Sequence, residues 1–407
     1  MIRTMLVAAG VTTMGTLPIF LLTAQAVLVQ QDLGVSNAQV GTAATVFFAT
    51  AALGSVPAGR LAERLGGRAS PAVAGLLAVV SLLGIALFPV SYAFLLAFLV
   101  VGGLGNAMGQ VSANVLLAQV VPARRQGVAF GVKQSAIPIS TLLGGLAVPA
   151  IGLTLGWRWA YAGAAAFALT MALVAPQVAS RPQRTGRASG PPFDAVVATA
   201  TASLIVIAIG TGLASAGTNA LGAYLVIWSV HIGVGAGAAG LLLAAASLLS
   251  ITARILSGVA ADRRGGRNLP VVAGQLAVGA VSLLLLATGG TTALVVGALA
   301  AFAIGWSWPG LLIFAVVRSS PGSPAVSTSI IQVGAFVGGA SGPGLFGLLV
   351  GAFSFEAAWR AAACSLALAA VLMLVGRRLL VTALGRRTPV VVEASEGASR
   401  TGPRVIR

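Results

Sequence analysis

The feature that most constrains this chain is a series of long apolar runs that recurs from one end of the sequence to the other. Each run holds about 20 to 29 residues, and a helix of that length can cross a hydrocarbon core of about 30 Å. The composition agrees, because 58% of the residues are hydrophobic and only 8% are charged, whereas a soluble domain carries charge on about a quarter of its residues. The sequence therefore predicts an all-α membrane protein.

The apolar runs form two sets of six, separated by a polar break. The first six cover 5–30, 39–60, 70–90, 92–120, 127–153 and 157–178, and the last six cover 195–222, 235–261, 269–288, 291–317, 325–351 and 357–379. This pattern predicts an N-terminal six-helix bundle at 1–180, a cytoplasmic linker at 181–194, a C-terminal six-helix bundle at 195–380 and a disordered tail at 381–407. The tail is rich in Arg, Gly and Ser, a composition typical of disorder.

The basic residues indicate how the chain crosses the membrane. Arginines gather at both termini and in the connections after runs 2, 4, 6, 8 and 10, whereas the opposite connections hold only Arg158 and Arg360. The positive-inside rule therefore places both termini in the cytoplasm. We expect a multi-pass protein of the bacterial cytoplasmic (inner) membrane.

The charge and the rare residue types exclude other classes. The net charge of +17 does not indicate nucleic-acid binding, because the basic residues lie in alternate connections and not on one face. One His, one Cys and seven acidic residues leave too little to build a metal centre or a catalytic cluster inside the apolar runs. We therefore expect no enzyme, no cofactor and no metal site.

An internal repeat relates the two sets of runs. The segment from Gly59 to Arg68 reads GRLAERLGGR, and the segment from Gly258 to Arg267, 199 residues later, reads GVAADRRGGR. A Trp-Arg pair also opens the last run of each set. Both copies of the repeat follow the second run of their set, which indicates two similar halves.

On these segments the chain resembles the major facilitator superfamily. The resemblance implies two six-helix bundles related by a pseudo-two-fold axis along the membrane normal, with the substrate bound between them and exposed alternately to each side. It also implies a gating latch in each half. The latch residues would be Gly59, Glu63, Arg64, Gly66 and Arg68 in the first half, and Gly258, Asp262, Arg263 and Arg267 in the second. The alternative is a plain basic loop with one neutralising acid.

Two cations lie inside apolar runs. Arg254 precedes Gly258 by four residues and Asp262 by eight, so the three share one helix face. It is either part of the gate or a side chain that extends to the headgroups. Lys133, the only lysine, lies in run 5 beside Gln134 and close to Pro138. It either faces a central cavity and binds an anion, or extends to the cytoplasmic surface.

Uncharged polar and aromatic residues inside the runs are further candidates for the substrate site. Buried amides can orient a solute, and they also hold helices together. We expect the site to draw on Lys133, Gln134, Asn106, Gln110, Gln332, Trp306 and Gln25. Tyr224 and Trp228 are expected at the outer membrane interface, where aromatic belts form.

The function expected from these features is secondary transport of a small solute by a monomer in the lipid bilayer, with a coupled proton or counter-substrate. Lys133 and the lack of acids near the middle of any run favour a small organic anion, such as a monocarboxylate. Export of amphipathic drugs by proton antiport is the alternative, with Asp32 as the acid that could titrate. An integral-membrane enzyme or a sensor is less well supported by the residues present.

Overall fold

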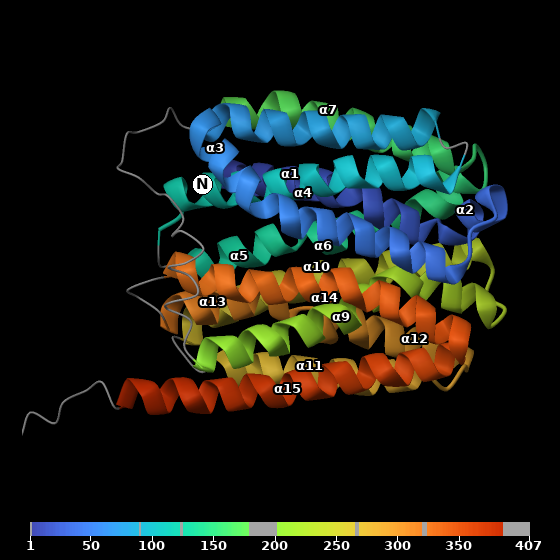
Figure 1. The fold of residues 1–407 in the computed structure, drawn as a ribbon. Coiled ribbons are helices and arrows are strands. Elements are labelled where there is room, and N and C mark those ends of the chain that lie inside the picture. Colours follow the sequence, from blue (N-terminus) through green and yellow to red (C-terminus); the bar gives the residue numbers. More distant parts are fainter. Residues whose placement is uncertain are drawn as a thin grey trace, which may run out of the picture.

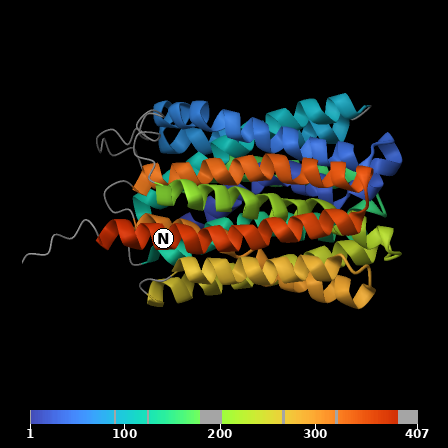
Figure 2. The same ribbon diagram turned by 60° about the horizontal axis from the view of Figure 1, so that its bottom comes forward.

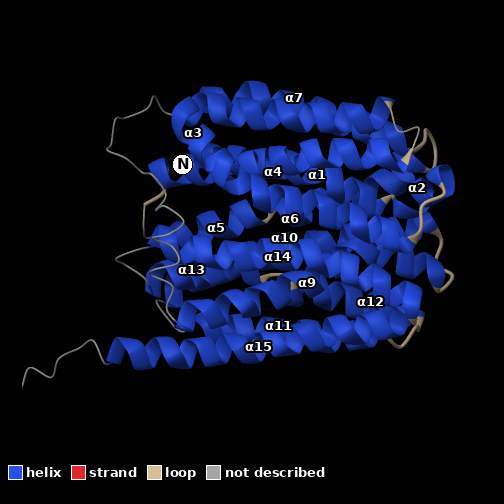
Figure 3. Ribbon diagram, viewed as in Figure 1, coloured by secondary structure: helices blue, strands red, loops and turns tan. Residues whose placement is uncertain are grey.

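The structure is a computed structural model that describes residues 2–88, 91–122, 125–178, 202–264, 268–319 and 324–385. These residues form helices and short connections, with no strand among them (Figure 3). The helices of the first half are α1 (Ile2–Ala24), α2 (Ala26–Leu33), α3 (Asn37–Leu87), α4 (Tyr92–Val120), α5 (Gln126–Gln134), α6 (Ala136–Ala147), η2 (Val148–Gly152) and α7 (Trp157–Val178). Those of the second half are α9 (Ala202–His231), α10 (Ala236–Arg264), α11 (Asn268–Leu286), α12 (Thr291–Ala300), η3 (Ala301–Gly305), α13 (Trp308–Ser319), α14 (Pro324–Ala352) and α15 (Phe355–Gly385).

The predicted all-α membrane fold is confirmed. Within the described residues, 11 helical segments are long and apolar enough to cross a membrane. The second predicted run is the first limb of α3, which is not among the 11. Gly66 divides α3 into two limbs. Its backbone φ is 72°, a conformation that glycine adopts without a steric penalty. Ser36 and Gln39 start α3 with a reciprocal capping box.

Figures 1 and 2 show an elongated bundle whose helices run roughly parallel to one long axis. The start of α1 and the last turn of α15 lie at the same end (Figure 1). We call this end the basic end, because Arg3 lies in the first turn of α1 and Arg377 and Arg378 lie within the last three turns of α15, and we call the other end the opposite end. In Figure 1, helices α1 to α7 occupy one side of the bundle and α9 to α15 the other. The two sides meet along the middle, where α5 and α6 of the first half lie near α10 and α14 of the second.

Three of the apolar runs are interrupted helices. Gln25 separates α1 from α2, Ser135 separates α5 from α6, and Trp306 with Ser307 separates η3 from α13. Irregular backbone at membrane depth is tolerated where it is buried in protein or lines a cavity. All three interruptions are buried in protein, so their irregular backbone is shielded from lipid.

The structure corrects two expectations. Tyr224 and Trp228 do not form an interfacial belt, because both are buried against aromatic rings of α14 and α15. Their position near the outer end of the span predicted their depth in the membrane, but it did not predict which side of α9 they face. Residues 381–385, assigned to the tail, are the end of α15. The linker at 181–194 and the rest of the tail lie outside the described residues.

Candidate functional site between the two halves

The first contact between the halves is the seam of α5 and α6 against α10. At the basic end, a Cβ on Gly258 would lie 2.6 Å from the carbonyl oxygen of Gly127. At the opposite end, a Cβ on Gly145 would lie 2.5 Å from the carbonyl oxygen of Gly240. Between them, the hydroxyls of Thr141 and Ser247 are 2.7 Å apart. Small residues thus bring the two backbones together along the whole seam.

Asp262, from the second copy of the repeat, crosses this seam. Its Oδ1 accepts a hydrogen bond from the amide of Gly127 at 2.9 Å, and its Oδ2 accepts one from Val128 at 3.1 Å. Both amides belong to the first turn of α5, where backbone N–H groups lack helical acceptors and the helix dipole favours a negative charge. A carboxylate of one half therefore caps a helix of the other.

Arg254 lies deeper in the same seam and does not extend to the surface, because only 1% of it is exposed. Its Nη1 donates to the carbonyl oxygen of Gln134 and its Nη2 to that of Trp306, each at 2.5 Å. Its Nε has no partner among the described residues. The guanidinium thus ties α10 to the interruptions of two other helices, one in each half. This geometry favours the gate over the snorkelling alternative.

The second contact between the halves is the seam of α3 against α14. A Cβ on Gly41 would lie 2.4 Å from the carbonyl oxygen of Pro343, and one on Gly347 would lie 3.0 Å from that of Asn37. The hydroxyl of Tyr224 on α9 donates to the same Asn37 carbonyl at 2.7 Å. These contacts all lie toward the opposite end of the bundle.

Aromatic rings from both halves meet between the seams. Phe20 of α1 lies 6.5 Å from Phe48 of α3 and 6.3 Å from Trp306, centroid to centroid. Phe302 lies 5.1 Å from Trp306. We call these four residues the aromatic cluster. Gly222 of α9 completes it, since a Cβ there would lie 2.7 Å from the Trp306 indole. Phe20, Phe302 and Trp306 are buried and Phe48 is half-buried, so a solute could lie among the first three rings only after one of them moves.

Lys133 lies in the last turn of α5 and is 5% exposed. It follows Ala129 by one helical turn, and Ala129 is buried in a small apolar cluster with Met5 of α1 and Ala113 of α4. Within the described residues we find no hydrogen bond or ion pair for its ammonium group. The lysine therefore faces the interior of the first half. Its neighbour Gln134 is also buried and joins the Arg254 contact through its backbone.

The other predicted amides are not brought together. Asn106 is buried beside Gly15 of α1, and its Oδ1 has no described partner. Gln25 is buried beside Gly152, and both its amide atoms also lack described partners. Gln110 and Gln332 are half-buried. Of the predicted substrate residues, the structure places only Trp306 in the aromatic cluster.

Among the described latch residues, those of the first copy make fewer contacts than those of the second. Gly59 has no neighbouring atom where a Cβ would lie, and Arg64 and Arg68 are exposed. Arg263, in the second copy, is also exposed. The side chain of Glu63 and the whole of Arg267 lie outside what the structure describes. Of the described gating residues, Gly258, Asp262 and Arg254 are thus the ones that contact the other half.

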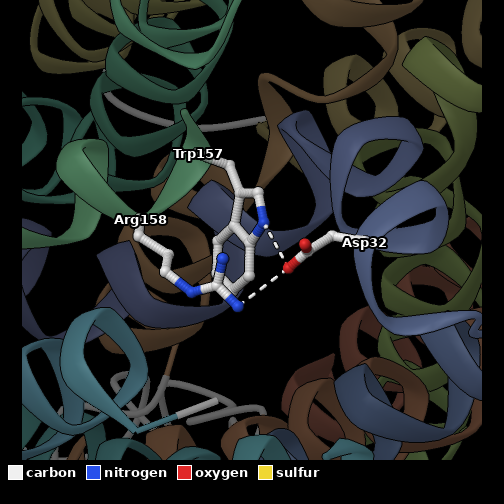
Figure 4. A network of polar contacts seen from close by, with 3 residues as sticks. All are labelled: Asp32, Trp157 and Arg158. Atoms are coloured by element: carbon white, nitrogen blue, oxygen red, sulfur yellow. Dashed lines mark hydrogen bonds and ion pairs between the residues drawn. The ribbon is translucent and has the colours of Figure 1, made fainter. Parts of the chain in front are cut away.

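At the opposite end, Asp32 ties the end of α2 to the start of α7 (Figure 4). Its Oδ2 lies 2.8 Å from Nη2 of Arg158 and accepts a hydrogen bond from the Trp157 indole at 3.2 Å. The guanidinium of Arg158 stacks 4.7 Å from the Trp157 ring. All three residues belong to the first half, so this network stabilises one bundle and does not join the two.

Phe20 and Tyr224 were missed by the sequence analysis. Phe20 has no charge and no repeat partner, and Tyr224 was assigned to the lipid interface. One signal was available for Tyr224: it follows directly after a run whose glycines leave room for close helix contacts.

An interior built from two six-helix halves, with broken helices where they meet, defines the class of secondary transporters. A family model described as Major Facilitator Superfamily matches residues 4–206 and again 207–402. The chain belongs to this family, and it is a transporter and not an enzyme.

Two known proteins extend this result. The chain is 30% identical over 350 residues to a "Chloramphenicol resistance protein" of Streptomyces lividans, covering 83% of this chain and 86% of the relative. It is also similar to the structure of the proton:xylose symporter XylE bound to 6-bromo-6-deoxy-D-glucose. That match has a TM-score of 0.71 and 16% identity, and covers 91% of this chain and 94% of the other. At this identity the second likeness concerns the fold alone.

Proposed function

We propose that this transporter exports small amphipathic aromatic compounds from the cytoplasm, in exchange for a proton or a counter-substrate. The observation that carries the proposal is the aromatic cluster, where Phe20 and Phe48 of one half meet Trp306 of the other. Such rings supply stacking and apolar contact area to a flat aromatic solute. The resistance function in the name of the relative supports the same substrate class.

The proposed orientation places the basic end in the cytoplasm of a bacterial cell, with the protein in the inner membrane. The uneven distribution of arginine between alternate connections supports this orientation. In the proposed cycle a monomer moves residues 1–180 as one bundle and 195–380 as the other. The two bundles separate first at the basic end and then at the opposite end.

The test is chloramphenicol accumulation in cells that produce the protein, compared with cells that produce Trp306→Ala at the same level. We expect the wild-type protein to lower accumulation and the variant to lose most of that effect, because its cluster lacks the largest ring. Gly274→Leu is a matched control, since a side chain at Gly274 would meet open space. Equal accumulation with wild-type protein and empty vector would contradict the proposal.

A second candidate function is exchange of a small organic anion. The observation that favours it is Lys133, an ammonium buried in the first half without a described counter-ion. Charge burial without a partner is costly, and an anionic solute would offset that cost. Selective carboxylate exchange that is lost in Lys133→Ala and retained in Lys133→Arg would support this candidate. Carboxylate exchange that both variants retain would remove it.

A further inference from the structure

Trp306 takes part in two sets of contacts, one through its ring and one through its backbone carbonyl. Its indole lies in the aromatic cluster, 6.3 Å from Phe20 and 5.1 Å from Phe302, centroid to centroid. Its backbone carbonyl accepts a hydrogen bond from Arg254, whose guanidinium also lies 5.9 Å from the indole ring. The same residue therefore places its ring in the cluster and its carbonyl on Arg254.

The sequence explains why the two carbonyls are available to Arg254. In a helix, the carbonyl of Gln134 would accept from the amide of residue 138, but Pro138 has no N–H. Trp306 follows the last residue of η3, and carbonyl groups at the end of a helix lack helical donors. One guanidinium replaces the missing donors of both helices. The position 199 residues earlier holds Ser55, which bonds within its own helix, so the second half alone has this arrangement.

We infer that Trp306 couples the aromatic cluster to the seam at the basic end, because its ring and the Arg254 clamp cannot both keep their places when a solute occupies the cluster. The clamp is the pair of hydrogen bonds from Arg254 to the carbonyls of Gln134 and Trp306. The inference rests on the proposed function only for the identity of the solute. It assigns Trp306 and Arg254 the role of positioning residues that act as one unit.

The direction of the coupling suits an exporter. Both Trp306 and Phe20 are buried, so a solute that enters the cluster must displace a ring. By reciprocity, a solute that loosens the clamp binds more tightly when the clamp is open, which is the state open to the basic end. Re-forming the clamp returns the indole to the cluster and lowers the affinity. The solute is then released at the opposite end.

The experiment uses full-length protein in nanodiscs, where both membrane faces are accessible to reagents. The natural cysteine is removed as Cys364→Ala, and Ala261→Cys is introduced as a reporter. Ala261 is fully buried and lies on the helix face of Arg254 and Gly258. The rate of labelling by a charged maleimide then measures opening at the basic end. Ala244→Cys reports in the same way from the opposite end of the same face.

In the reporter background we expect Arg254→Lys to raise the labelling rate without ligand by about tenfold, the effect of losing one hydrogen bond to a charged group. An ammonium cannot bridge two carbonyls as the guanidinium fork does. Trp306→Ala should also raise the rate, by less, because the carbonyl loses the ring that positions it. Labelling of Ala244→Cys should not rise in either variant.

The matched control is Ser247→Ala, which removes the cross-seam contact to Thr141 on the same face of α10 without touching Trp306. Equilibrium binding of chloramphenicol separates coupling from damage. We expect Arg254→Lys to bind chloramphenicol several-fold more tightly than wild type, whereas Ser247→Ala should not.

Arg254→Lys that labels like Ser247→Ala, or that labels faster but binds chloramphenicol no more tightly, overturns the inference. Trp306→Ala that labels like wild type overturns it as well. Wild-type protein that binds no chloramphenicol contradicts the proposed substrate, and the ligand-free labelling of the two variants still decides whether the clamp exists.

Discussion

The two seams between the halves differ in how far they extend and in what holds them. The seam of α5 and α6 against α10 is closely packed from Gly127 and Gly258 at the basic end to Gly145 and Gly240 at the opposite end. It also contains two charged groups, Asp262 and Arg254, that bond backbone groups across it. The seam of α3 against α14 has close glycine contacts toward the opposite end, and Tyr224 adds a neutral hydroxyl.

Toward the basic end, the nearest atoms to a Cβ on Gly334 or Gly338 of α14 belong to α9. Sequence repeats relate the two halves, yet they do not make the two seams equivalent. Charged side chains form hydrogen bonds across the first seam, whereas the second seam is held by close packing and a neutral hydrogen bond. The predictions below test that difference, from the largest expected effect to the smallest.

Gly258→Leu should abolish transport. The new side chain would meet the Gly127 carbonyl, and backbone cannot move aside as a flexible side chain can. Overpacking of this kind costs about 1–3 kcal/mol or more, so the purified protein should also melt at a lower temperature. Transport assays with Gly274→Leu as the control check this result. Wild-type transport by Gly258→Leu would show that the seam is not closed at any step of the cycle.

Asp262→Asn should slow transport by about threefold to tenfold. Each carboxylate oxygen of Asp262 accepts from one backbone N–H group, and in asparagine one of these oxygens is replaced by an NH2 group, which cannot accept. The measurement is the initial rate of transport, with expression and melting temperature as controls. Asp262→Glu should retain more activity than Asp262→Asn, since it keeps the charge at the start of α5. The reverse order would mean that charge at this seam is unimportant.

Tyr224→Phe should have a smaller effect, about fivefold at most, since it removes one neutral hydrogen bond to the Asn37 carbonyl. The seam of α3 against α14 should open more readily at the opposite end. Maleimide labelling of Ala38→Cys in the Cys364→Ala background measures that opening, because Ala38 lies beside Gly347. An effect as large as that of Asp262→Asn would remove the distinction between the seams.

Asp32→Asn should change transport by less than about twofold, because an ion pair that is partly exposed contributes little to stability. Its side chain is 40% exposed and belongs to one half only. The rate measured with an imposed pH gradient checks this prediction. Loss of gradient-driven transport in Asp32→Asn would instead identify Asp32 as the titrating group of a drug–proton antiporter.

The sequence predicted the parts of this structure that depend on length and local chemistry. Run length predicted the spans, and helical spacing placed Arg254 on the face of Asp262. It did not predict that the partners of Arg254 would be backbone carbonyls, because any residue type can supply a carbonyl. Phe20 was not singled out, and Tyr224 was assigned to the membrane interface, for a related reason: the sequence of an apolar segment does not distinguish a ring that faces lipid from one that faces the other half.

The central claim is that the space between the halves carries an amphipathic aromatic solute, and counterflow tests it most directly. Proteoliposomes with wild-type protein are preloaded with unlabelled chloramphenicol, and uptake of the labelled compound is compared with that of protein-free liposomes. The account predicts faster uptake with the protein, and a return to the protein-free rate with Gly258→Leu. Equal rates with and without wild-type protein, together with counterflow of a carboxylate, would contradict it and favour the anion exchanger.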